Sequence, residues 1–231
     1  MPKVLRLSPE MIEAAIAHLS AADPVMRRMI ELIGPFALKP HRSRFRVLVR
    51  AIVSQQISTA AARSILARLE TALEPEGLTP EALARLSPQK MRRAGLSPQK
   101  QGYLKDLARR VARGEVELQR FGRMSDEDVI AELIQVKGIG EWTAQMFLIF
   151  TLGRPNIFPH ADLGVRTAIQ RAYRLAELPN REQALRIAEA WNPYATVGSW
   201  YCWRILALPK ETWTDSPPET KGVKSAQAAS R

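Results

Sequence analysis

The chain has 231 residues, of which 46% are hydrophobic, enough for one substantial domain or two small ones with a buried core. This composition excludes a disordered chain, and the single cysteine, Cys202, excludes an internal disulfide or a four-cysteine metal or iron–sulfur site. Lysine and arginine exceed the acidic residues by 34 to 23, a net charge of +11, which favours an anionic polymer as partner, although a well-solvated basic protein fits the charge as well.

Several helix starts are marked by a hydroxyl residue that precedes a proline. These pairs are Ser8-Pro9, Thr79-Pro80, Ser87-Pro88 and Ser97-Pro98. The hydroxyl can accept the first free N–H groups of a helix, and proline suits the first helical position. The sequence LSPQK occurs twice, at 86–90 and 96–100, which we interpret as two successive helix entries.

Between these starts the apolar residues recur at helical spacing. Phe45, Leu48 and Ile52 form one such stripe, and Leu104, Leu107 and Val111 form another. No alternating run with a hairpin-turn signal indicates a sheet. The sequence therefore predicts an all-α protein of roughly nine to twelve short helices with brief connections.

The segment LIQVKGIGEWTA, at 133–144, predicts a helical hairpin. We expect one helix to end at Val136–Lys137, a tight turn through Gly138 and Gly140 that needs positive φ, and a second helix to open at Glu141. The free N–H groups of that second helix would bind phosphate, supported by Lys137 and Thr143. The alternative is a corner between two helices with no ligand.

Asp162 lies at the end of an irregular segment, 155–162, that precedes a predicted helix over 163–175. Its position is typical of an N-cap, and the residues alone favour this structural role. The helix terminus also favours the ionised carboxylate, which suits stabilisation of a cationic, oxocarbenium-like sugar better than proton donation.

Aromatic residues are concentrated in the last third of the chain. They are Trp142, Trp191, Tyr194, Trp200, Tyr201 and Trp203. We expect Trp191 and Trp200 to pack in the core, with Cys202 as a buried small hydrophobe. Exposed aromatic faces would instead stack an extruded base, and cationic bases most strongly.

In this order the three features resemble the helix–hairpin–helix (HhH-GPD) DNA glycosylases, and among them the 3-methyladenine DNA glycosylase II (AlkA-like) group. The resemblance covers roughly residues 23–208. Its most specific pieces are VKGIGEWTA at 136–144, IFPHADLGVR at 157–166 and WNPYATVGSWYCWR at 191–204. AIVSQQIS at 51–58 and GLSPQKQGYL at 95–104 support it.

The resemblance implies a role for each matching residue. Asp162 matches the catalytic aspartate. Gly138, Gly140 and Thr143 match positions that meet DNA phosphates, with Lys137 beside them. The positions that line the base pocket are Trp142, Met146 and Trp203, and Gln56 matches the wedge that fills the gap left by the flipped nucleotide. The main-chain carbonyls of Ile134, Val136 and Ile139 would hold a monovalent cation, Na⁺ or K⁺, that bridges to phosphate.

The chain departs from some relatives. Those that cleave the strand carry a lysine two residues after the last hairpin glycine, where this chain has Trp142, so no Schiff base is expected. Gln56 stands where some insert leucine, and Met146 where some have an aromatic residue. Residues 8–38 read as helices, so we expect no N-terminal β-domain.

We therefore expect a monofunctional glycosylase that removes alkylated bases of the 3-methyladenine and 7-methylguanine type from duplex DNA by base flipping. It would need no cofactor for the chemistry and no iron–sulfur cluster. The alternatives are a non-catalytic helix–hairpin–helix DNA-binding protein, a glycosylase for oxidised, mismatched or deaminated bases and, last, a basic scaffold that binds no DNA.

The expected architecture is one helical region, 1–214, with two subdomains flanking a DNA-binding cleft. Residues 1–49 with 160–214 would form one subdomain and 50–159 the other, followed by a disordered basic tail at 215–231. Without a long apolar window the chain is expected to contact no membrane, and with its single cysteine it is expected in the cytoplasm, associated with the nucleoid in a bacterium. We also expect a monomer.

Overall fold

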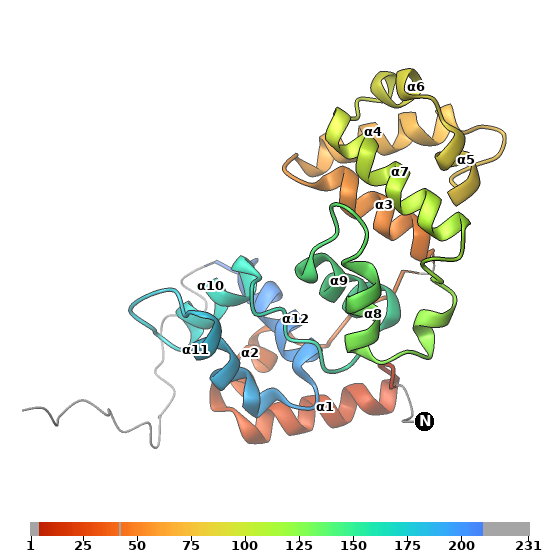
Figure 1. Ribbon diagram of the computed structural model, residues 1–231. Helices are drawn as coiled ribbons and strands as arrows, with labels where there is room; N and C mark the ends of the chain where they lie inside the picture. The colour runs from red at the N-terminus through yellow and green to blue at the C-terminus, as the bar shows by residue number, and fades with distance from the viewer. Residues whose placement is uncertain (1–4, 42, 210–231) are drawn as a thin grey trace, which may run out of the picture. The chain divides into compact units, whose positions relative to one another are not determined.

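The computed structural model describes residues 5–41 and 43–209, and every regular element within these ranges is helical (Figure 1). The all-α prediction is thus confirmed, with twelve α-helices in the part of the chain that is described. None of these helices is both long enough and apolar enough to traverse a bilayer. The expected tail at 215–231 falls outside the described residues.

The chain forms two compact units, each described here by itself. Unit 1 comprises 1–7 and 38–159, and unit 2 comprises 8–37 and 160–231. The expected subdomains differ from these units over 1–7 and 38–49. The reason is helix α3 (Arg44–Ser54), which runs without interruption through position 49 and buries Leu48, Ile52 and Val53. A boundary after residue 49 would cut this helix in two.

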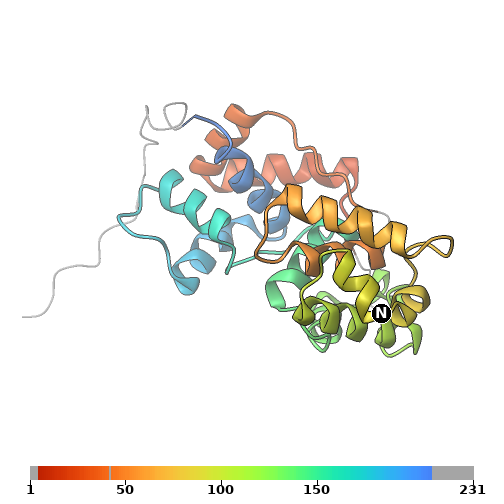
Figure 2. The ribbon, with the colours of Figure 1, turned by 90° about the horizontal axis from the view of Figure 1, so that it is seen from above.

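Unit 1 is a bundle of short helices in which α7 is the longest. Its elements are α3 (Arg44–Ser54), α4 (Thr59–Ala72), α5 (Pro80–Arg85), α6 (Pro88–Arg93), α7 (Pro98–Ala112), η1 (Arg120–Gly122), α8 (Asp126–Leu133), α9 (Glu141–Phe147) and η2 (Leu148–Leu152), a π-helical turn. Helix α7 packs against α5, α3 and α6, and α9 contacts α8 and α3 (Figures 1 and 2). Helix α7 is therefore the helix on which three other helices of this unit pack.

Unit 2 is built around α12 (Ala195–Ile205), whose first eight residues are all buried. The other elements are α1 (Pro9–Ala22), α2 (Pro24–Ile33), α10 (Leu163–Ala172), α11 (Arg181–Ala188) and η3 (Glu189–Trp191). Helices α10, α2 and α1 pack on α12. The predictions that Trp191 and Trp200 lie in the core and that Cys202 is buried are confirmed. Burial, with Asp23 and Asp162 nearby, raises the pKa of the Cys202 thiol, so this thiol stays protonated and unreactive.

The predicted helix starts are confirmed by their cap hydrogen bonds. The side chains of Ser8, Thr79, Ser87 and Ser97 each accept the backbone N–H three residues later, at 3.2, 3.2, 3.3 and 3.3 Å respectively. Two further helices begin at cap residues that are not hydroxyls. The carboxylate of Asp23 caps α2, and Asn180 forms a reciprocal capping box with Gln183 at α11.

Candidate functional site

The predicted hairpin is present, but its first helix ends earlier than expected. Helix α8 stops at Leu133, rather than at Val136–Lys137. The following residues turn tightly, because the N–H of Val136 bonds the carbonyl of Leu133 at 3.1 Å and the N–H of Ile139 bonds the carbonyl of Val136 at 3.0 Å. Helix α9 opens at Glu141 as predicted.

The two hairpin glycines are required for different reasons. Gly138 has φ +84°, and a Cβ there would lie 2.2 Å from Cδ2 of Tyr103. Gly140 has φ −98°, so Gly138 alone supplies the positive φ that was predicted for this turn. A Cβ on Gly140 would meet nothing within 4 Å. Gly138 is thus fixed by backbone conformation and packing, while Gly140 keeps the surface open for a ligand to approach.

The start of α9 carries the features of an anion-binding terminus. Its first helical hydrogen bond joins the N–H of Ala144 to the carbonyl of Gly140 at 3.0 Å, so the N–H groups of Glu141 and Thr143 make no intrahelical bond. Lys137 is exposed beside them. Thr143, in contrast, is only 9% exposed.

The carbonyls of Ile134, Val136 and Ile139 follow the C-terminal end of α8. The oxygen of Val136 already accepts the N–H of Ile139, but a carbonyl has two lone pairs. The end of a helix also carries partial negative charge. Oxygen donors in this setting fit a hard monovalent cation.

Trp142 and Met146 lie one helical turn apart and line a pocket of about 350 Å³ in unit 1. Val47, Leu48 and Phe147 contribute to its largely apolar wall. Trp142 is 47% exposed, unlike the core tryptophans of unit 2. A larger hollow of about 530 Å³, between the start of α3 and the end of α7, contains none of the predicted site residues.

Gln56 lies in the connection between α3 and α4 in the left-handed region, with φ +56°. This conformation is uncommon for a residue other than glycine, and it indicates backbone strain that the surrounding structure holds in place. The side chain is exposed. Both properties agree with a residue presented outward from a fixed loop.

Asp162 and Trp203 belong to unit 2 and are hydrogen-bonded to each other. Oδ1 of Asp162 accepts the backbone N–H of Val165 at 2.8 Å, so the residue caps α10 as predicted. The same oxygen accepts the indole N–H of Trp203 at 2.9 Å. Asp162 is only 9% exposed. These two hydrogen bonds to one oxygen hold the carboxylate in a fixed orientation. The sequence predicted that Trp203 lines the base pocket, but it did not predict the hydrogen bond from Trp203 to Asp162.

Three residues of unit 1 that the sequence did not single out contact the hairpin or the Gln56 loop. They are Gln55, Lys100 and Asp106. Asp106 on α7 is 8% exposed, and a buried carboxylate is rare unless it is paired. Burial opposes ionisation of Asp106, but the N–H of Lys137 and the guanidinium of Arg110 outweigh it and lower its pKa. No sequence pattern singled out Asp106, because at about 100° per residue it lies on the opposite side of α7 from the apolar stripe of Leu104, Leu107 and Val111.

The described residues thus form an all-helical protein with a glycine hairpin, an apolar pocket beside it and a capped, indole-bound aspartate. The chain belongs to the HhH-GPD superfamily of base excision DNA repair proteins, whose model matches residues 49–193.

Similar proteins carry the name that the resemblance implied. DNA-3-methyladenine glycosylase 1 of Schizosaccharomyces pombe is 33% identical over 203 residues, which cover 84% of this chain and 88% of the relative. A structure of the 3-methyladenine DNA glycosylase of that organism with abasic DNA has a TM-score of 0.77 at 31% identity, covering 85% of this chain and 98% of the other. A DNA-3-methyladenine glycosidase from Bacillus halodurans matches with the same TM-score and identity, over 85% and 88% of the two chains. The predicted resemblance is confirmed.

Proposed function

We propose that this protein is a monofunctional DNA glycosylase that hydrolyses the N-glycosidic bond of alkylated bases in duplex DNA. The observation that carries the proposal is the carboxylate of Asp162, fixed by Val165 and Trp203 in a chain of the HhH-GPD superfamily. The relatives and structural neighbours named as 3-methyladenine glycosylases support the substrate class.

The chemistry requires little from the protein beyond orientation and charge. A purine alkylated on a ring nitrogen is cationic, so it departs as a neutral base when the C1′–N bond breaks and its electron pair moves to the base. Positive charge then develops on the sugar, and an anionic carboxylate stabilises it. Water adds its oxygen to C1′ and releases a proton. Asp162 serves here as an electrostatic partner, and its Oδ1 is held in place by the two N–H groups that it accepts.

DNA would be held and opened by residues of unit 1. The N–H groups at the start of α9 and the side chain of Lys137 would bind backbone phosphate, which positions the protein without reading sequence. Gln56 would enter the stack as the damaged nucleotide rotates out. Trp142 and Met146 would contact the extruded base. A cation held by the carbonyls of Ile134, Val136 and Ile139 would add positive charge beside the phosphate.

We further propose that the enzyme does not cleave the DNA strand. Cleavage by a glycosylase of this kind needs an amine that forms a Schiff base with the sugar. The position two residues after Gly140 is Trp142, which has no amine. Excision should therefore leave an intact strand with an abasic site.

The test is incubation of the full chain with an alkylated duplex, followed by detection of free bases and heat-labile abasic sites. We expect 3-methyladenine and 7-methylguanine to be released, with strand breaks only after heat or alkali. Binding without any released base would support the non-catalytic alternative. Release of oxidised or mismatched bases in preference to alkylated ones would support a different glycosylase.

Asp162→Asn separates catalysis from helix capping. Asparagine caps a helix about as well as aspartate, so folding and DNA binding should be nearly unchanged. Excision should fall by about 100-fold or more, because a neutral amide cannot stabilise the developing charge. Equal losses of binding and excision would show that Asp162 is a structural cap and would contradict its catalytic role.

A further inference from the structure

The two adjacent glutamines of the SQQIS segment differ in exposure and in hydrogen bonding. Gln56 is exposed and left-handed, as described above. Gln55 is part-buried, and its side-chain amide donates to the carbonyl of Gly138 at 2.7 Å. This bond links the loop after α3 to the hairpin across 83 positions of sequence. The wedge loop (55–58) and the hairpin turn (134–140) are therefore in direct contact through Gln55.

Helix α7 is hydrogen-bonded to the end of α3 and to the start of the wedge loop. Nζ of Lys100 donates to the carbonyls of Val53 and Gln55, at 2.7 and 2.8 Å. These carbonyls lie at the C-terminal end of α3, where the helix has no N–H groups left to satisfy them and where a cation is favoured. Lys100 is thus committed to the protein backbone in a strongly basic unit.

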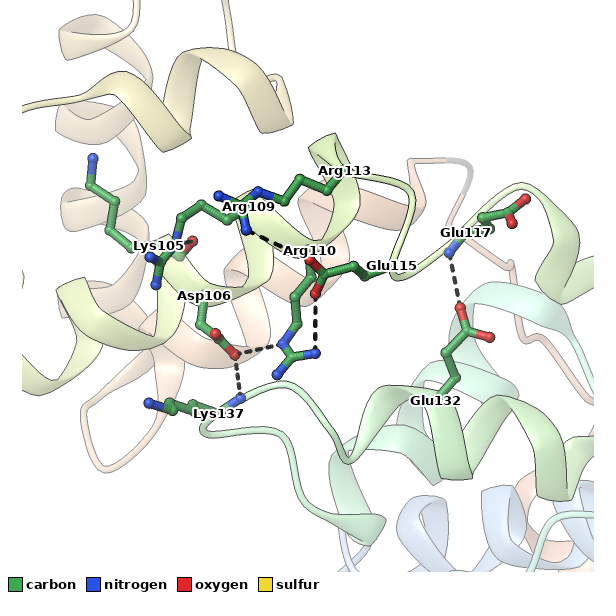
Figure 3. A network of polar contacts seen from close by, with 9 residues as sticks. All are labelled: Lys105, Asp106, Arg109, Arg110, Arg113, Glu115, Glu117, Glu132 and Lys137. Carbon is green, nitrogen blue, oxygen red and sulfur yellow. Dashed lines mark hydrogen bonds and ion pairs between the residues drawn. The ribbon is translucent and has the colours of Figure 1, made fainter.

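The same helix holds the hairpin turn. Oδ2 of Asp106 accepts the backbone N–H of Lys137 at 2.9 Å and Nε of Arg110 at 3.1 Å (Figure 3). The ring of Tyr103, between Lys100 and Asp106 on α7, packs so closely on Gly138 that a side chain there has no room. Positions 100, 103 and 106 are spaced by three, so they lie along one side of α7.

We propose that Gln55, Lys100 and Asp106 are positioning residues that lock the wedge loop and the hairpin into one preformed DNA-contacting surface. The inference rests on the proposed function, in which Gln56 fills the stack and the hairpin binds phosphate. With the two segments fixed to α7 and to each other, a phosphate held by the hairpin sets the place at which Gln56 enters the duplex. Because the wedge loop and the hairpin are already ordered in the folded protein, DNA binding does not have to order them.

The repeated LSPQK sequence supplies matched controls. Lys100→Met removes the charged donor but keeps the apolar stem, and Lys90→Met makes the same change at the equivalent, exposed lysine of α6. Gln55→Glu replaces the donating amide with a carboxylate that repels the Gly138 carbonyl. Gln89→Glu makes that change at an exposed glutamine of the same unit.

The first measurement is amide hydrogen exchange on the folded full chain, which needs no enzymatic activity. We expect Gln55→Glu and Lys100→Met to speed exchange at 55–58 and 137–140 by about tenfold or more, because the tethers to these segments are lost. The two controls should match the wild type. Unchanged exchange in both test variants would overturn the proposal.

The second measurement compares excision of one lesion in two contexts, opposite its normal partner and opposite an abasic site. A lesion without a partner is extruded easily and has little need of a well-placed wedge. We expect Gln55→Glu to slow excision from the paired context by about tenfold, and by about twofold or less from the unpaired one. Equal slowing in both contexts, in parallel with a lower melting temperature, would indicate a merely structural role and would contradict the proposal.

Two substitutions at Asp106 test the tie between α7 and the hairpin turn. Asparagine can still accept the N–H of Lys137, whereas leucine cannot, so Asp106→Asn should retain most of the paired-context rate that Asp106→Leu loses. Equal losses in the two variants would remove Asp106 from the set. If the wild type releases no base at all, the proposed function fails. The exchange data alone then decide whether these residues lock the wedge loop to the hairpin turn.

Discussion

The carboxylate of Asp162 combines a structural and a chemical role on a single oxygen. The cap on α10 could be predicted, because an aspartate directly before an amphipathic helix is a local pattern. The bond from Trp203 could not, since it joins positions 41 residues apart and exists only because α10 packs on α12. The indole makes the orientation of the carboxylate depend on the core of unit 2.

Trp203→Phe removes this donor while keeping an aromatic ring. We expect the excision rate to fall by about 10- to 100-fold, since a carboxylate with one fewer tether is held less precisely against the sugar. DNA affinity should change little. The measurement is the single-turnover rate on alkylated duplex with enzyme in excess.

Trp191→Phe is the matched control, because Trp191 donates its indole N–H to another buried carboxylate, Asp23, at 3.1 Å. It should lower the stability of unit 2 by about 1–3 kcal/mol without changing the rate well below the melting temperature. A rate for Trp203→Phe as high as that for Trp191→Phe would show that the Trp203 bond does not position Asp162.

At the scale of elements, sequence analysis located helix starts better than helix ends. Starts such as Ser97-Pro98 carry side-chain caps that are local and chemical. The end of α8 was predicted too late because Val136 continues the apolar stripe of that helix. Val136 is buried although it lies in the turn, where its N–H donates to the carbonyl of Leu133 rather than to the carbonyl of Glu132, as it would in an α-helix. Apolar periodicity reports burial, and burial does not require helix.

The hairpin glycines give a prediction that separates stability from binding. Gly138→Ala should destabilise unit 1 by about 2 kcal/mol or more, because positive φ disfavours alanine and the new Cβ meets Tyr103. Gly140→Ala should lower stability by only about 0.5–1 kcal/mol, as expected for a changed N-cap, and should weaken DNA binding through contact with the phosphate. Urea unfolding and duplex titration measure the two effects. A Gly140→Ala variant with full DNA affinity would show that no phosphate approaches this turn.

The tie between α7 and the hairpin should make unit 1 sensitive to acid. The pKa of Asp106 is lowered on folding, so its ionised form adds stability above the ordinary aspartate pKa, and this stability is lost as the pH falls through the lowered value. Between about pH 5 and pH 2.5 the wild type should therefore lose more unfolding free energy than Asp106→Asn does. Urea unfolding across this range tests it, with the exposed Asp128→Asn as control. Parallel pH curves for wild type and Asp106→Asn would refute the linkage.

At the scale of the whole molecule, charge is divided unequally between the two units. Unit 1 holds 22 lysines and arginines against 12 acidic residues, a net +10, whereas unit 2 holds 12 against 11, a net +1. The total charge was readable from composition, but its distribution required the fold, because unit 2 is assembled from both ends of the chain. The unit that contains the hairpin and the wedge loop is therefore the one with the electrostatic means to hold DNA.

The salt dependence of DNA binding should accordingly be controlled by unit 1. Each phosphate contact that is removed lowers the slope of log affinity against log salt by about one. We expect Lys137→Gln to lower the slope by this amount, because Lys137 is exposed beside the start of α9. Arg181→Gln, an exposed cation at the start of α11 in unit 2, should leave the slope unchanged. Titrations of an unmodified duplex between about 50 and 200 mM salt measure both variants. Equal reductions would show that DNA is attracted by the net charge of the whole chain rather than by the surface that carries the hairpin.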